Sequence, residues 1–113
     1  MAKVEIVESL FRQIEAKFKS KAHDIIDLLY AVEENPHKGK VLGSVGGILI
    51  KELKYENFRF YFITDGFKLK CLGEKELIDL LLRFVRMSDK KQQQQTIGEI
   101  KHILRIIGAS GFF

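Results

Sequence analysis

Apolar residues recur along the first third of the chain at the spacing of amphipathic helices. Residues 4–7 form a short, mostly apolar run with two valines and an isoleucine, which is suited to a first strand. Ser9 then offers an N-cap for a helix with apolar residues at Leu10, Phe11, Ile14 and Phe18. A second helix is predicted from the apolar stripe Ala22, Ile25, Ile26, Leu29 and Val32. Asn35-Pro36 ends it, because a residue before proline is pushed out of the helical region.

The pattern changes to strand-like alternation in residues 46–66, which read as one β-hairpin and the start of a second. A turn at Glu56-Asn57, with asparagine adopting a positive φ, places Lys54 opposite Arg59 and Glu52 opposite Tyr61. Side chains alternate across a strand, so the hairpin has two distinct faces. One face carries Glu52, Lys54, Arg59 and Tyr61, and the other carries Leu53, Tyr55, Phe58, Phe60 and Phe62.

Asp65-Gly66 is a second hairpin signal in the same stretch. A two-residue loop there sets Tyr61 opposite Lys70 and Phe60 opposite Cys71. Lys70 would then join the polar face, and Cys71 would be a buried, inert thiol on the apolar face.

The remaining elements are less sharply defined. Residues 37–47 are rich in glycine and lysine and read as a connector, since no complete phosphate-binding glycine motif is present. Residues 77–85 suit a strand or a short helix by periodicity, and we favour a central strand. Ser88-Asp89 offers an N-cap for a helix over residues 90–107, and the tail 108–113 either frays or packs through Phe112 and Phe113. The order of elements predicts a single α+β domain spanning residues 1–113.

Composition restricts the range of functions. Nineteen basic and fifteen acidic side chains leave a net charge of +4, which permits a nucleic acid partner but does not require one. Three histidines without mutual ligand spacing and a single cysteine give no metal site, and no cofactor is expected. With no targeting segment and no apolar run long enough for a membrane span, we expect a soluble, cytoplasmic protein without a membrane partner.

The polar face of the hairpin is the main candidate site. Lys54 directly opposite Arg59 is unfavourable unless an anion relieves the repulsion, and cations beside an aromatic ring suit phosphate binding and base stacking. The alternative interpretation is a solvated face with cross-strand ion pairs. A second candidate lies in residues 83–91, where Arg86, Lys90 and Lys91 surround the start of the last helix and suit phosphate binding or simple solvation.

These elements and residues resemble the RelE/ParE superfamily of toxins from toxin–antitoxin pairs, especially its HigB-like branch. The hairpin motifs are Glu52-Leu53-Lys54 and Phe58-Arg59-Phe60-Tyr61. The flanking motifs are Asn35-Pro36, Lys38-Gly39-Lys40, Leu42, Phe84-Val85-Arg86-Met87 and Lys90. The resemblance covers about residues 4–105 and implies a RelE-like fold, in which an N-terminal strand and a helical hairpin pack on an antiparallel sheet with a C-terminal helix.

The resemblance also implies a function and partners. It implies a type II toxin that cuts mRNA on the ribosome without a metal, with Lys54, Arg59 and Arg86 on the phosphate and Glu52 or Tyr61 assisting. Further RNA contacts would come from Lys70, Lys90 and Lys91. The expected partners are a cognate antitoxin and ribosome-bound mRNA, with a homodimer when the antitoxin is absent.

Two other functions remain open. In RelE the second strand of the sheet carries two lysines, at the positions of Ile50 and Glu52 here, so a ParE-like or degenerate member would bind gyrase, RNA or an antitoxin without cutting. A plain structural interaction domain with solvated cations is the third possibility.

Overall fold

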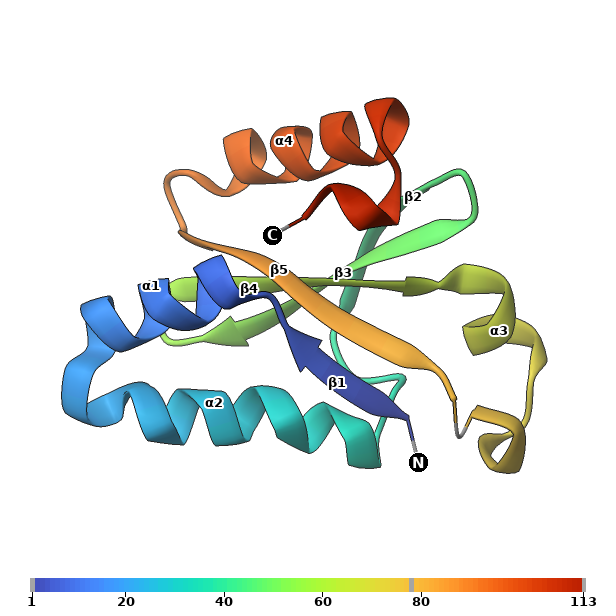
Figure 1. Cartoon of the computed structure of the whole chain (residues 1–113), viewed down its shortest axis with the longest axis horizontal. Coiled ribbons are helices and arrows are strands. Elements are labelled where there is room, and N and C mark those ends of the chain that lie inside the picture. Colours follow the sequence, from blue (N-terminus) through green and yellow to red (C-terminus); the bar gives the residue numbers. More distant parts are fainter. Residues whose placement is uncertain (1, 78, 113) are drawn as a thin grey trace.

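The computed structural model describes residues 2–77 and 79–112 and has helices on both sides of a central sheet (Figure 1). The helices and strands are, in chain order, β1 (Lys3–Ile6), α1 (Glu8–Phe18), α2 (Ala22–Tyr30), β2 (Lys40–Val45), β3 (Ile48–Tyr55), β4 (Phe58–Asp65), α3 (Gly66–Cys71), β5 (Leu81–Asp89) and α4 (Gln93–Ile106). The fold is therefore a compact α+β structure.

The sheet of the described residues is mixed. Its strand order is β1-β5-β4-β3-β2. β1 pairs with β5 in parallel, whereas the other neighbours are antiparallel. The prediction of an antiparallel sheet is therefore correct for β2, β3, β4 and β5. It is wrong for β1, which lies at the edge of the sheet and runs parallel to β5.

The helical hairpin agrees with the predicted apolar stripes. Its buried positions are Leu10, Ile14, Ala22, Ile25, Leu29 and Val32. A 3-10 turn over Ala31–Glu34 extends α2, and Asn35 ends it as predicted. The predicted cap at Ser9 is wrong: α1 begins at Glu8 with Val7 at the N-cap position, so Ser9 lies inside the helix.

The central hairpin has the predicted register. Tyr55 pairs with Phe58, Lys54 with Arg59, and Glu52 with Tyr61. The residue with positive φ in the turn is Glu56 (52°), whereas asparagine was expected to take that conformation. The two faces of β3 and β4 are therefore separated as the alternation predicts.

The predicted second hairpin is wrong, because β4 ends in a helix. The carboxylate of Asp65 accepts a hydrogen bond from the backbone N–H of Lys68 at 3.0 Å and caps α3. Lys70 therefore lies on α3, away from the polar face, and Cys71 is exposed at the end of that helix. The antiparallel neighbour of β4 is β5, which comes from much later in the chain.

Three further element boundaries differ from the sequence-based expectations. Part of the expected connector is β2, which pairs along the free edge of β3. The strand expected at residues 77–85 begins at Leu81, and Leu77 lies in a 3-10 turn, while Ile78 lies outside the described residues. Ser88 and Asp89 end β5, and α4 starts at Gln93 because Asp89 accepts the N–H of Gln92 and closes an intervening turn.

The core lies mainly between the sheet and the α1–α2 pair. Phe60, Phe62 and Phe84 are fully buried, and the rings of Phe62 and Phe84 are 4.7 Å apart. Phe18 packs against Phe58 from α1, with the two rings edge to face. On the opposite face, α4 buries Ile97, Ile100 and Leu104. The tail was expected either to fray or to pack through Phe112 and Phe113. Phe112 is buried, which agrees with packing, and Phe113 lies outside the described residues.

Candidate functional site

The predicted polar face is assembled by three adjacent strands. Lys54, Arg59 and Ser88 form one row across β3, β4 and β5, and Glu52, Tyr61 and Arg86 form the next. The sheet thus brings together five residues that the sequence analysis assigned to the site: Glu52, Lys54, Arg59, Tyr61 and Arg86. Of the three remaining candidates, Lys90 and Lys91 follow β5 directly, whereas Lys70 lies beyond the far end of β4.

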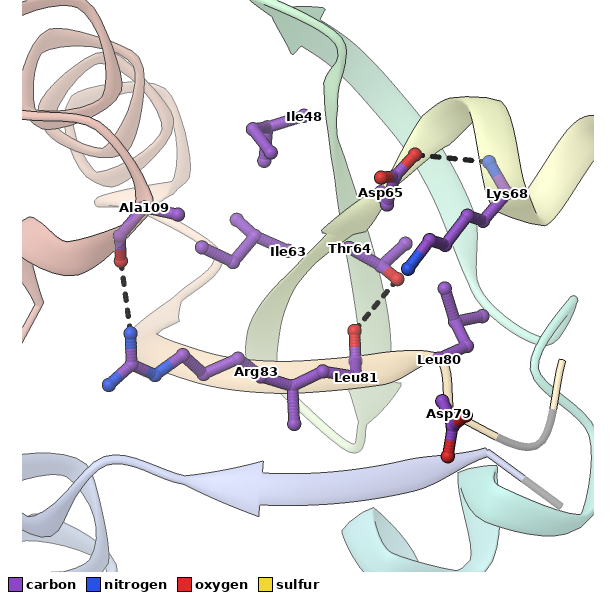
Figure 2. Close-up of a pocket in the computed structure, with 10 residues that line it drawn as sticks. All are labelled: Ile48, Ile63, Thr64, Asp65, Lys68, Asp79, Leu80, Leu81, Arg83 and Ala109. Atoms are coloured by element: carbon purple, nitrogen blue, oxygen red, sulfur yellow. Dashed lines mark hydrogen bonds between the residues drawn. The ribbon is translucent and has the colours of Figure 1, made fainter.

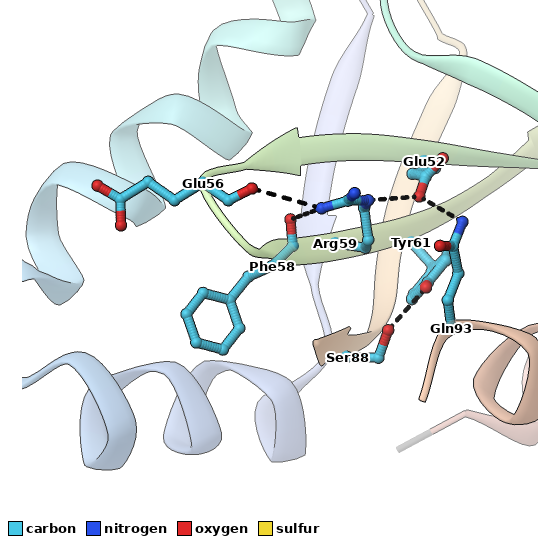
Figure 3. A network of polar contacts seen from close by, with 7 residues as sticks. All are labelled: Glu52, Glu56, Phe58, Arg59, Tyr61, Ser88 and Gln93. Carbon is cyan, nitrogen blue, oxygen red and sulfur yellow. Dashed lines mark hydrogen bonds and ion pairs between the residues drawn. The ribbon is translucent and has the colours of Figure 1, made fainter. Parts of the chain in front are cut away.

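Arg59 and Glu52 form a buried ion pair at the centre of this face. Nε of Arg59 lies 3.1 Å from Oε1 of Glu52, and the side chains are only 9% and 6% exposed. Nη1 of Arg59 also donates to the backbone carbonyls of Glu56 and Phe58. The anion that the Lys54–Arg59 pairing requires is therefore supplied from within the fold by Glu52 (Figure 3).

Tyr61 is fully buried beside the ion pair. Its hydroxyl lies 2.7 Å from Oγ of Ser88, with which it shares a hydrogen bond. Burial raises the pKa of Tyr61 above its ordinary value, and the Ser88 hydrogen bond opposes that rise. A phenol held protonated in this way suits a structural hydrogen bond better than proton transfer at neutral pH.

The helix α4 covers part of the polar face. Its first residue, Gln93, donates from Nε2 to Oε1 of Glu52 at 3.0 Å, so the carboxylate oxygen that forms the ion pair with Arg59 also accepts a hydrogen bond from α4 (Figure 3). Neither Ser88 nor Gln93 was predicted as a member of the site. Ser88 had been interpreted as a helix cap, and no local pattern pairs Gln93 with a residue 41 positions earlier.

Arg86 lies at the edge of the covered area. Its Nε contacts Oε1 of Glu99 on α4 at 2.9 Å, and its Nη1 donates to the Val85 carbonyl. The guanidinium also lies over the Phe112 ring, 5.1 Å from its centroid. A pocket of about 400 Å³ between α1 and β5 leaves this side chain partly accessible and is lined by Ser9, Leu10, Gln13, Val85 and Arg86.

The remaining predicted cations near this face are open to solvent. Lys54, Lys90 and Lys91 are exposed, and they border the buried network at the end of the sheet where β3 turns into β4. These three exposed positive charges surround a buried network in which the charges of Arg59 and Glu52 cancel.

Lys51 is a second buried charge and lies on the opposite face of β3. It is 2% exposed, its Nζ donates to the Pro36 carbonyl at 3.3 Å, and it lies 5.5 Å from the centroid of the Phe62 ring. Burial lowers the pKa of Lys51 below its ordinary value. The turn predicted at Glu56-Asn57 implies this pairing of Lys51 with Phe62 by its register, but Lys51 was not predicted to be a buried charge.

The chemistry available at the polar face is therefore anion binding at its rim and not an open acid–base site.

Within residues 2–77 and 79–112, no cluster of histidine, cysteine or carboxylate side chains has the arrangement of a metal site. None of the helices in the same ranges is long and apolar enough to cross a membrane. In comparisons with known proteins, no family model, curated protein or solved structure matches this chain.

Proposed function

We propose that this protein is a toxin-like domain of the RelE/ParE type that acts by binding RNA without cleaving it. The observation that carries this proposal is the buried Arg59–Glu52 pair. An arginine that clamps a scissile phosphate presents its N–H groups to the substrate. Here Arg59 directs Nε to a carboxylate and Nη1 to two carbonyls, and only 9% of its side chain is exposed.

The order of the elements supports the RelE/ParE type. A strand, a helical hairpin, a β-hairpin and a last helix are arranged on one sheet, in the sequence that the resemblance implies. Tyr61, which would assist proton transfer in a nuclease, is instead buried and held by Ser88. Both features favour a member that retains the scaffold and has lost the catalytic arrangement.

RNA contacts would come from the exposed lysines at the rim. Lys54 extends from β3, and Lys90 and Lys91 follow β5 at the same end of the sheet. Exposed lysines bind phosphates as mobile point charges and release counterions, so this contact depends on salt and little on base sequence.

Binding and integrity of one labelled RNA test this proposal together. We expect a single-stranded RNA oligonucleotide to bind in fluorescence anisotropy, with an affinity that falls as salt rises. The RNA should stay intact on a denaturing gel, both alone and when it is presented as mRNA on ribosomes. Failure to bind at low salt, or cleavage by the purified protein, would overturn the proposal.

Ribosome-dependent cleavage is the second candidate. The observation that favours it is the convergence of Glu52, Tyr61 and Arg86 in one row of the sheet, next to Arg59. This function requires α4 to release its contacts with Glu52 and Arg86. Mapping mRNA ends after induction distinguishes the two: codon-spaced cuts support cleavage, and growth arrest with intact mRNA supports binding. DNA damage signals without cuts would point to gyrase.

A further inference from the structure

The strands of the parallel pair, β1 and β5, lead into helices on opposite faces of the sheet. β1 continues into α1 on one face, and β5 leads to α4 on the other (Figure 1). Where adjacent parallel strands send their helices to opposite faces, a crevice opens at the carboxyl ends of the strands, and open α/β sheets bind ligands there. In this protein the pocket of about 400 Å³ between α1 and β5 occupies that position.

A β-bulge shapes β5 at this pocket. Phe84 pairs with Phe62 and Arg86 pairs with Tyr61, so Val85 has no partner in β4. The pairing of β5 with β1 also ends at the level of Phe84. A bulge bends its strand and redirects the side chains beside it. The bulged segment therefore lies against α1 without a strand between them.

The pocket combines buried apolar residues with polar side chains. Leu10 and Val85 are buried, whereas Ser9 and Gln13 are exposed and lie one turn apart on the same side of α1. Among the described residues, none forms a hydrogen bond with the side-chain amide of Gln13. Apolar surface with a few polar groups beside it is typical of sites for small ligands or parts of larger ones.

Arg86 contributes a flat and firmly held guanidinium. Its Nη1 donates to the Val85 carbonyl at 2.7 Å, its Nε lies 2.9 Å from Oε1 of Glu99, and its centre lies 5.1 Å from the centroid of the Phe112 ring. Because Glu99 already balances its charge, this side chain does not require an anionic ligand. Guanidinium planes also stack on neutral rings, as they do on unpaired bases of RNA.

Another pocket, at the start of β5, differs in its charges (Figure 2). Arg83 there is held by Glu5 through Nε and by the Ala109 carbonyl through Nη1. The charged residues that line this pocket are two acids and two bases: Asp65, Asp79, Lys68 and Arg83. This mixed lining favours no one class of ligand, in contrast to the pocket between α1 and β5.

We propose that the pocket between α1 and β5 binds one unpaired adenine of the RNA, an inference that rests on the proposed RNA binding. The base would stack on Arg86. Gln13 would donate to N7 of the base and accept from its N6 amino group, which is the pairing by which glutamine recognises adenine. An apolar cavity of about 150 Å³ holds benzene, so a pocket of about 400 Å³ has room for a purine.

β5 connects this pocket to the rim of exposed lysines. Arg86 lies three residues before Asp89, the end of the strand, which is about 10 Å of extended chain. Lys90 and Lys91 follow directly. An RNA strand whose phosphates contact these two lysines therefore passes close enough to place one base in the pocket. Phosphate contacts carry no sequence information, so the pocket would add a base preference to the contact at the rim.

Two short labelled RNAs of equal charge test this site by fluorescence anisotropy. One is an oligocytidine, and the other is the same oligomer with one central adenosine. We expect the full-length protein to bind the RNA with adenosine at least about fivefold more tightly, because stacking and the paired hydrogen bonds both favour the purine. Replacing this adenosine with 7-deazaadenosine, which lacks the N7 acceptor, should remove most of the preference.

Two glutamine variants provide a matched comparison. Gln13→Leu keeps the net charge and nearly the size of the side chain, and it should reduce the preference for adenosine to below about twofold. Gln95→Leu makes the same change at an exposed position of α4 outside the pocket and should keep the preference.

Three results would overturn the adenine site while the proposed RNA binding stands: equal binding of the two RNAs by wild type, an undiminished preference in Gln13→Leu, or an undiminished preference with 7-deazaadenosine. Binding of neither RNA at low salt would overturn both proposals.

Discussion

Nε of Arg59 lies 3.1 Å from Oε1 of Glu52, and together these two side chains convert the centre of a predicted phosphate site into a neutral, buried pair. Removing one partner leaves the other as an uncompensated buried charge, which lowers the free energy of unfolding by about 3–5 kcal/mol. Arg59→Met should therefore lower the free energy of unfolding by about 3 kcal/mol or more in urea denaturation.

The double variant Glu52→Gln/Arg59→Met separates the pair from general damage to the site. It should be more stable than Arg59→Met alone, because no buried charge is left without a partner. Lys54→Met, at the exposed neighbour of Arg59, should change stability by no more than about 0.5 kcal/mol. Equal stability of wild type and Arg59→Met would contradict a structural role for the pair.

The Tyr61–Ser88 hydrogen bond predicts a cost for a single-atom change. Tyr61→Phe leaves the Ser88 hydroxyl without its partner at 2.7 Å, and we expect a loss of about 1–2 kcal/mol. Adding Ser88→Ala should recover part of this loss, because both polar atoms are then gone. A double variant less stable than the sum of the single losses would count against the bond.

Tyr61 also predicts the behaviour at alkaline pH. Its pKa is raised in the fold, so the unfolded chain ionises first, at its ordinary value of about 10. The unfolding free energy should therefore fall as pH rises above that value. Comparing the pH profiles of wild type and Tyr61→Phe from neutral pH to pH 11 isolates this contribution, and identical profiles would refute it.

Lys51 predicts the opposite slope. Its pKa is lowered in the fold, so between that lowered value and its ordinary 10.5 the unfolded chain binds more protons, and the contribution of Lys51 to stability rises with pH. Lys51→Met should therefore be most favourable relative to wild type at low pH, with the difference shrinking toward pH 10.5. A difference between Lys51→Met and wild type that does not change with pH would contradict the assignment.

Glu99 on α4 forms an ion pair with Arg86 on β5 and neutralises its charge. Glu99→Gln should raise RNA affinity several-fold at low salt, because it frees a cation beside the open pocket of β5. It should have little effect on stability, since the pair is 26% and 51% exposed. Glu8→Gln removes the same charge from an exposed pair with Arg12 and serves as the control. Equal affinity gains in both variants would reduce the effect to net charge.

The hairpin shows how far the sequence alone leads. Its register was predictable because a turn position and strict alternation determine every facing pair, from Tyr55–Phe58 to Lys51–Phe62. The second hairpin was predicted wrongly because Asp65-Gly66 suits both a tight turn and the start of a helix. The hydrogen bond from the Lys68 N–H to the Asp65 carboxylate distinguishes the two, and it is visible only in the structure.

Local sequence patterns do not predict that the polar face is neutralised and partly covered. Ser88, Gln93 and Glu99 reach the polar face through pairings between distant segments, which neither propensity nor periodicity encodes. The sequence therefore identified most residues of the face but not that Glu52 and α4 neutralise and cover them.

One comparison tests the central claim most directly, namely that RNA binds at the lysine rim around a closed network. It measures single-stranded RNA affinity for the triple variants Lys54→Gln/Lys90→Gln/Lys91→Gln and Lys68→Gln/Lys70→Gln/Lys75→Gln. The first removes three charges from the rim, and the second removes three charges from the segment between β4 and β5, which contains α3 and the 3-10 turn Glu74–Leu77. We predict that the first loses at least about tenfold in affinity and about two units of salt slope, at roughly 0.7 per lysine. The second should stay close to wild type. Equal losses in both variants, or full affinity in the first, would contradict the proposal.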